Sequence, residues 1–146
     1  MSAPTSTMTE PSRRRLRPRH LWIIPGLAIA VYANSIAGEH NLGLVPLLLF
    51  GILPKLPFFL GLGQSTQRGQ LPPRAVVGWN AMHHPTLPLA VFGVAAAGIL
   101  PVFWTVSALA WLSHIVVDWG VGDGLRSADG FRLPGVGRLI GLGGRE

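Results

Sequence analysis

The sequence predicts an all-α fold, an integral membrane bundle of four transmembrane helices. Only 12% of the 146 residues are charged, 49% are apolar, and the mean hydropathy is +0.42. The 105 residues from 21 to 125 carry six charges, whereas about a quarter of an average chain is charged. The six are Glu39, Lys55, Arg68, Arg74, Asp118 and Asp123. This composition is typical of a membrane domain, which we expect over residues 21–119.

Four apolar segments account for the predicted spans, at about residues 21–37, 42–62, 75–100 and 101–119. The first has 17 residues, which is a short but sufficient length. Prolines predict kinks in the second span and a distorted first half of the third. These prolines are Pro46, Pro54 and Pro57 in the second span and Pro85 and Pro88 in the third.

Basic residues flank the apolar segments and predict the topology. Residues 1–20 form a basic tail that we expect to be disordered, and residues 120–146 form a Gly- and Arg-rich tail. The first tail has five Arg, the loop between the second and third spans has two, and the last tail has four. The loops near Glu39 and Pro101 have none. Both termini are therefore expected on the cytoplasmic side of a bacterial inner membrane.

The N-terminus also has a competing interpretation as a secretory signal. Arg13, Arg14 and Arg15 precede an apolar stretch, and small residues near 33–38 resemble a cleavage site. A membrane anchor has the same flanking charge, and further apolar segments follow. The anchor is therefore preferred.

Basic residues outnumber acidic ones, which gives a net charge of +6 and a pI near 11.6. This excess of positive charge predicts lipid or protein partners. No nucleic-acid partner is expected, because there is no basic face interleaved with aromatic residues. The tails are expected to meet anionic lipid, a protein partner or a second copy of the chain. For the C-terminal tail, a position along the cytoplasmic interface and disorder are both open. The absence of Cys excludes disulfides, thiolate metal sites and a Cys nucleophile.

Polar side chains inside the apolar segments share one level of the predicted bundle. A charge at the centre of a membrane helix costs about 2.5 to 3.5 kcal/mol on insertion scales, so such placement needs a reason. If consecutive helices alternate in direction, six such polar residues fall toward the cytoplasmic side of the bundle. They are Lys55 late in the second span, Asn80, His83 and His84 early in the third, and His114 and Asp118 late in the fourth.

Three of these residues form a candidate metal site. His114 and Asp118 are four residues apart, so they share one face of a helix. His84 precedes Pro85 and is biased away from helical conformation, which leaves His83 as the better inward candidate. His83, His114 and Asp118 offer the nitrogen and oxygen ligands that zinc or another divalent metal accepts.

Other interpretations of the cluster stay open. Asn80 can neighbour either His83 or His84, and the group can be a hydrogen-bonded staple between the third and fourth spans or a proton or ligand path. Lys55 opposes a metal, because an ammonium repels a cation. It can pair with Asp118 or extend to the cytoplasmic headgroups, and its place near the end of its span favours the headgroups. No H-E-x-x-H, G-x-S-x-G or P-loop pattern occurs.

Four short motifs occur in a fixed order, best after Trp79 and within residues 47–138. They are Trp79–His83, Ala110–Asp118, Gly122–Arg126 and Gly130–Phe131. They resemble the Asn-x-x-His, His-x-x-x-Asp, Gly-x-Gly-Leu-Lys and Gly-Phe signatures of a bacterial membrane family, domain-of-unknown-function family 4260. The resemblance implies a shared fold and topology. Two departures are Pro54-Lys55, where the family is expected to have Pro-Asp, and the ending Arg132–Gly135.

Two classes of function remain. The preferred one is a small, non-enzymatic multi-pass membrane subunit, because Lys55 replaces a carboxylate and no general base remains once Asp118 is a ligand. The alternative is a metal-dependent membrane hydrolase with His83, His114 and Asp118 as ligands and a bound water as nucleophile. A weaker similarity to membrane-bound metal-dependent hydrolases, which also pair intramembrane His residues with a His-x-x-x-Asp helix, supports the alternative by analogy. The sequence names no substrate.

Overall fold

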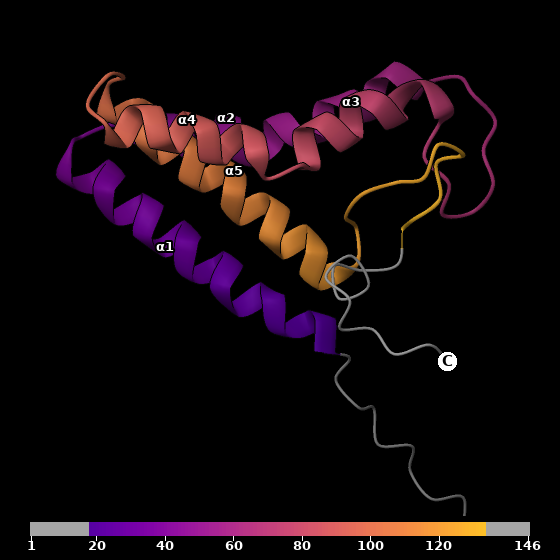
Figure 1. Ribbon diagram of the computed structural model, residues 1–146, viewed down its shortest axis with the longest axis horizontal. Helices are drawn as coiled ribbons and strands as arrows, with labels where there is room; N and C mark the ends of the chain where they lie inside the picture. Colours follow the sequence, from indigo (N-terminus) through magenta and orange to yellow (C-terminus); the bar gives the residue numbers. More distant parts are fainter. Residues whose placement is uncertain (1–17, 134–146) are drawn as a thin grey trace, which may run out of the picture.

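A computed structural model of the protein describes residues 18–133, and this part of the chain is helical (Figure 1). The predicted all-α class is confirmed for these residues, in which the only β pairing is an isolated bridge between Arg126 and Arg132. The elements are η1 (Pro18–Trp22), α1 (Ile23–Glu39), α2 (Val45–Ile52), η2 (Leu53–Gly61), α3 (Pro73–His83), α4 (Thr86–Ala96) and α5 (Val102–Val121). Here η denotes a 3₁₀ helix.

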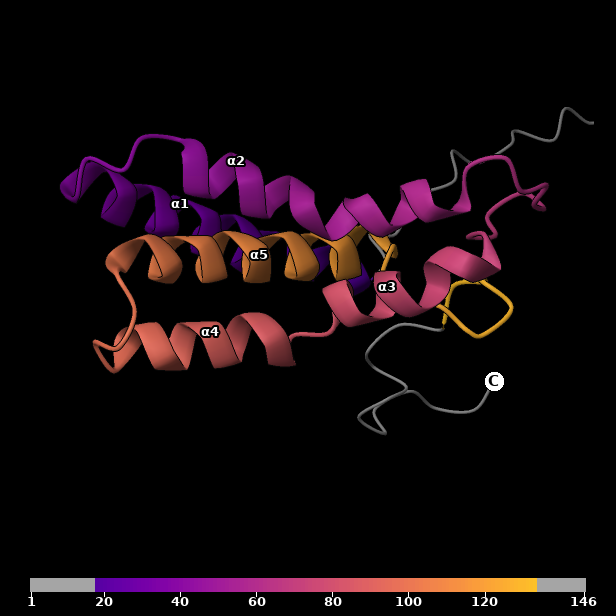
Figure 2. The same ribbon diagram turned by 90° about the horizontal axis from the view of Figure 1, so that it is seen from above.

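Helix α5 is the centre of the arrangement, and α1, α2 and α4 all pack against it. Figure 2 shows α4 on the side of α5 opposite to α2. Ala33 and Ala37 of α1 form one buried cluster with Val106 and Leu109 of α5. Because these side chains on α1 are small, the two helix backbones approach closely.

Helix α1 lies very close to α5 at Gly26. A Cβ atom at this position would lie 2.7 Å from Val117 Cγ2 and 3.1 Å from the Val117 backbone nitrogen. Ser113 Oγ donates a hydrogen bond to the Gly26 carbonyl oxygen, at 2.8 Å. The absence of a side chain at Gly26 therefore sets the spacing of these two helices.

The segment predicted as a kinked span at residues 42–62 is divided between two helices. The α-helix α2 passes directly into the 3₁₀ helix η2 at Leu53. Pro54 and Pro57 have no backbone N–H, so each removes one bond of an α-helical ladder, and the tighter 3₁₀ winding follows. This change of winding begins one residue before the prolines and carries Lys55 into η2.

The segment predicted at residues 75–100 is likewise two helices, with a break between α3 and α4. His84 has an extended ψ of 128°, as expected for a residue that precedes a proline. The break frees backbone carbonyls at the end of α3, and Trp111 Nε1 of α5 donates to one of them, Met82 O, at 2.7 Å. A side chain from the central helix thus replaces a bond that the helix break removes.

Large apolar side chains cover much of the outer surface. On η1 and α1 the exposed ones are Leu21, Trp22, Ile24, Leu27, Val31 and Tyr32, and on α2 and η2 they are Val45, Leu48, Leu49, Ile52, Leu56, Phe58, Phe59 and Leu60. Two helices, His20–Glu39 and Val102–Val121, are long and apolar enough to cross a membrane. A helix of 20 residues is about 30 Å long, which is the thickness of a bilayer core.

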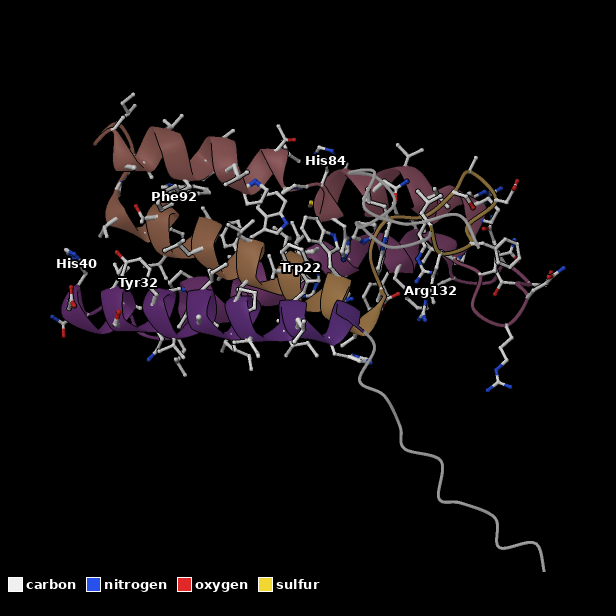
Figure 3. All side chains as sticks on the ribbon, turned by 60° about the horizontal axis from the view of Figure 1, so that its bottom comes forward. Trp22, Tyr32, His40, His84, Phe92 and Arg132 are labelled. Carbon is white, nitrogen blue, oxygen red and sulfur yellow. The ribbon has the colours of Figure 1, made fainter. Side chains whose placement is uncertain are left out.

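Most of the described charged residues gather at one end of the helices, whereas Glu39, the last residue of α1, lies at the other. His40 and Arg132 lie at opposite ends of the molecule (Figure 3). The end with Arg132 contains α3, η2 and the segment 122–133, which folds back so that Leu71 N donates to Gly130 O at 2.8 Å. Residues 1–17 of the tail that was predicted to be disordered lie outside the described residues. Residues 18–20 of the same tail are helical, because they form the start of η1. Residues 134–146 of the predicted C-terminal tail also lie outside the described residues.

Candidate functional site

One oxygen atom of Asp118 is the centre of the polar cluster. Its Oδ2 lies 2.5 Å from Lys55 Nζ, 3.0 Å from His83 Nε2 and 3.3 Å from His114 Nε2. Lys55 comes from η2, His83 from the last turn of α3, and both His114 and Asp118 from α5. The structure thus brings together four of the six polar residues singled out in the sequence.

His83 is fully buried, and its surroundings fix the orientation of its ring. The Trp79 ring stacks on it, with 4.0 Å between centroids and 11° between planes. His83 Nδ1 donates to the Trp79 carbonyl oxygen at 2.9 Å, since a carbonyl can only accept. A neutral His83 therefore directs the lone pair of Nε2 at the carboxylate. Either a second proton on Nε2 or a cation between the two groups makes this contact favourable.

His114 lies beside the same carboxylate without a hydrogen bond to it. Its Nε2 is buried and has no hydrogen-bond partner among the described residues, although Asp118 Oδ2 is 3.3 Å away. One ligand atom from each of His83, His114 and Asp118 lies within 4.8 Å of the other two. The three predicted metal ligands therefore converge in space, and a divalent cation is a chemically suitable partner for them.

Of the two positions that the sequence left open for Lys55, the cytoplasmic headgroups and Asp118, the structure has the less favoured one, Asp118. Its ammonium pairs with Asp118, lies 3.5 Å from Asp123 Oδ2, and stands 4.8 Å from the centre of the Trp79 ring. The Lys55 side chain is 36% exposed and that of Asp118 only 10%. Because Asp118 is poorly solvated, its attraction for the nearby ammonium exceeds what a more exposed carboxylate would provide.

Asn80 and His84 do not join the cluster. Asn80 Nδ2 donates to Arg126 O, and the Arg126 backbone N–H donates to Asn80 Oδ1, both at 2.8 Å. These two hydrogen bonds hold the segment 122–133 against α3. His84 is exposed at the helix break (Figure 3). Its Nδ1 lies 2.6 Å from the Thr86 hydroxyl oxygen, within hydrogen-bond distance.

Arg126 and Asp123 complete the charged end and were not chosen as candidates from the sequence. The Arg126 guanidinium is buried, pairs with Asp123 and donates to Gly69 O at 3.1 Å. Burial lowers the pKa of Arg126, and the negative charge of Asp123 acts in the opposite direction. Trp79 Nε1 donates to Gly124 O at 3.0 Å and closes this network. The only signal for these residues was their place in the Gly122–Arg126 motif.

No known protein family, curated protein or solved structure matches this chain. The chemistry of the site must therefore be inferred from the chain's own residues. What they provide is a carboxylate shared by an ammonium and two imidazoles, at the level where two broken helices meet α5.

Proposed function

We propose that the chain is a multi-pass protein of the bacterial inner membrane with four spans and both termini in the cytoplasm. The spans are α1, α2 with η2, α3 with α4, and α5. Support comes from the apolar outer surface, from two helices of spanning length, and from the Arg side chains at one end. The described ones are Arg68, Arg74, Arg126 and Arg132.

The cluster is proposed to hold this bundle together, as part of a small non-enzymatic membrane subunit. The single observation that carries this proposal is the ion pair between Lys55 and Asp118, at 2.5 Å, with His83 on the same oxygen. Because the three residues come from η2, α5 and α3, one carboxylate connects three segments. The basic end and tails would then meet anionic lipid, a protein partner or a second copy.

The resemblance to domain-of-unknown-function family 4260 belongs to the same proposal. Residues of three of its motifs lie in one connected network of hydrogen bonds and ion pairs, linked through Asp123 and Lys55. They are Asn80, His83, Asp118 and Arg126. Shared structural roles are a physical reason for such motifs to occur together.

A metal-dependent hydrolase is the second candidate, and the orientation of His83 favours it. Histidines that bind a metal commonly donate the other ring N–H to a backbone carbonyl, as His83 does to Trp79. His83, His114 and Asp118 would hold the ion, and the ion would supply an activated water to a substrate from the cytoplasmic leaflet. Lys55 Nζ contacts the Asp118 oxygen that would be a ligand, so it competes with any such ion.

Metal analysis separates the two candidates. The purified full-length protein would be incubated with Zn²⁺, washed and assayed for bound metal, beside His83→Ala, His114→Ala and Lys55→Met. For a subunit we expect no stoichiometric metal in the natural chain and a lower unfolding temperature in both His variants. Zn²⁺ bound by the natural chain, lost in both His variants and bound more fully in Lys55→Met, would instead favour the proposal of a hydrolase over that of a subunit.

A further inference from the structure

A cavity of about 370 Å³ lies between α1, α2 and α5, on the face away from α4. Its lining includes Ala30 of α1, Leu47 and Gly51 of α2, and Ala110 and His114 of α5. Five of its seven lining residues are only partly buried, so the cavity opens to the outside of the bundle. Its volume falls within the range of about 300–1,000 Å³ that is usual for ligand sites.

Small side chains create this cavity. A Cβ atom added at Gly51 would have no atom within 4 Å, and Ala30 and Ala110 line the cavity from the two facing helices. Protein interiors are packed at a density of about 0.75 and contain few voids larger than a water molecule. A space of this size between packed helices is therefore unusual, and because it opens to the outside of the bundle a molecule from the surroundings can enter it.

Water is an unsuitable occupant. A bound water needs about two to four polar partners. The Ser113 hydroxyl in the lining already donates to Gly26 O, and His114 provides the only other polar side chain. The occupant should therefore be mainly apolar.

The surroundings of the cavity favour a lipid chain. Leu27 and Val31 of α1 and Leu48 and Ile52 of α2 are exposed on the same two helices, and in the proposed membrane they face acyl chains. The His114 end of the cavity is at the level of Asp118, where basic groups outnumber acidic ones. The charged groups there are Lys55, Arg126 and Arg132 against Asp118 and Asp123, which are joined in ion pairs with one positive charge in excess. These groups lie beyond the cavity lining, and of the three basic side chains that of Arg132, at 55%, is the most exposed.

We propose that this cavity binds one acyl chain of an anionic membrane phospholipid, with the phosphate headgroup at the charged end. The chain fills the space between Ala30, Gly51 and Ala110, and the phosphate lies near the excess positive charge. This inference depends on the proposed membrane location, but not on whether the Asp118 cluster is structural or catalytic.

Gly51→Leu tests the site, because a Cβ added there has no atom within 4 Å and the rest of the side chain would occupy the space for a lipid. The matched control is Gly93→Leu on α4, where a Cβ also has no atom within 4 Å and which does not line the cavity. Each purified full-length protein would be titrated in detergent with phosphatidylglycerol or phosphatidylcholine. Native mass spectrometry would count bound lipid, and thermal unfolding would be followed in parallel. Ala30→Leu fills the cavity from the opposite wall if Gly51→Leu does not fold.

We expect about one phosphatidylglycerol per natural chain, with an unfolding temperature that rises with lipid concentration. In Gly51→Leu, retention should fall by about tenfold or more and the rise should disappear, while Gly93→Leu behaves like the natural chain. Equal retention in Gly51→Leu would overturn the site, and equal retention of phosphatidylcholine would overturn the headgroup assignment. A dimer mass that is lost in Gly51→Leu would assign the cavity to a second copy instead. Release of the protein from membranes by alkaline carbonate would refute the membrane location itself, independently of these results.

Discussion

The ion pair between Lys55 and Asp118 can be tested by a double-mutant cycle. Lys55→Met keeps a long aliphatic side chain and removes the ammonium, so the Asp118 carboxylate, only 10% exposed, loses its closest partner. Breaking a fully buried pair in this way costs about 3 to 5 kcal/mol, and the pair between Lys55 and Asp118 is only part-buried. Because His83 remains 3.0 Å from the carboxylate and can donate to it when protonated, we expect the lower end, about 3 kcal/mol.

The reverse substitution should cost less. In Asp118→Asn the Lys55 ammonium, 36% exposed, can turn toward water, so the expected loss is about 1 to 2 kcal/mol. The double variant leaves no unpaired charge and should cost little more than Asp118→Asn alone. The expected coupling free energy is therefore about 2 to 3 kcal/mol in favour of the pair.

Unfolding of the four proteins by sodium dodecyl sulfate in mixed micelles, followed by circular dichroism, measures each free energy. Costs that add to within about 0.5 kcal/mol in the double variant would show that the two residues act independently. A smaller cost for Lys55→Met than for Asp118→Asn would also contradict the reasoning, because it would mean that Asp118 is not the poorly solvated partner.

Three further predictions concern the packing around this pair. Gly26→Ala should destabilise the protein by about 1 to 3 kcal/mol, Val117→Ala should partly restore it, and Gly38→Ala, with open space around it, should be neutral or stabilising in the same unfolding assay. Trp111→Phe leaves a carbonyl at the end of α3 without its donor and should cost about 1 to 3 kcal/mol; an unchanged unfolding free energy would mean that another donor replaces it. Asn80→Ala should speed hydrogen exchange in the segment 122–133 more than in α5, and equal protection in both proteins would show that Asn80 does not hold this segment.

The sequence predicted those features that depend on local spacing. The preference for His83 over His84 came from the proline that follows His84, and the extended ψ of His84 has the same cause. The convergence of His114 and Asp118 followed from their spacing of four residues on one helix. The helical class followed from the composition and from the lengths of the apolar segments.

Features that depend on distant contacts were missed. Lys55 and Asp118 are 63 residues apart, so the sequence offered their pairing only as an alternative, and the place of Lys55 near the end of its span favoured the headgroups instead. The return of the segment 122–133 to α3 depends on Asn80, whose partner is a backbone group and carries no sequence signal. Periodicity also could not distinguish a kinked span from two helices, since Pro54 and Pro57 are compatible with either.

Cysteine accessibility in intact cells tests the proposed topology most directly, because the natural chain contains no Cys. Asn41→Cys lies in the loop between α1 and α2, Ser65→Cys lies in the loop between η2 and α3, and Ser107→Cys is a fully buried control. With a thiol reagent that does not cross membranes, we predict labelling of Asn41→Cys in intact cells, labelling of Ser65→Cys only after permeabilisation, and none of Ser107→Cys. Labelling of Ser65→Cys in intact cells, or of both loops only after permeabilisation, would contradict the four-span topology.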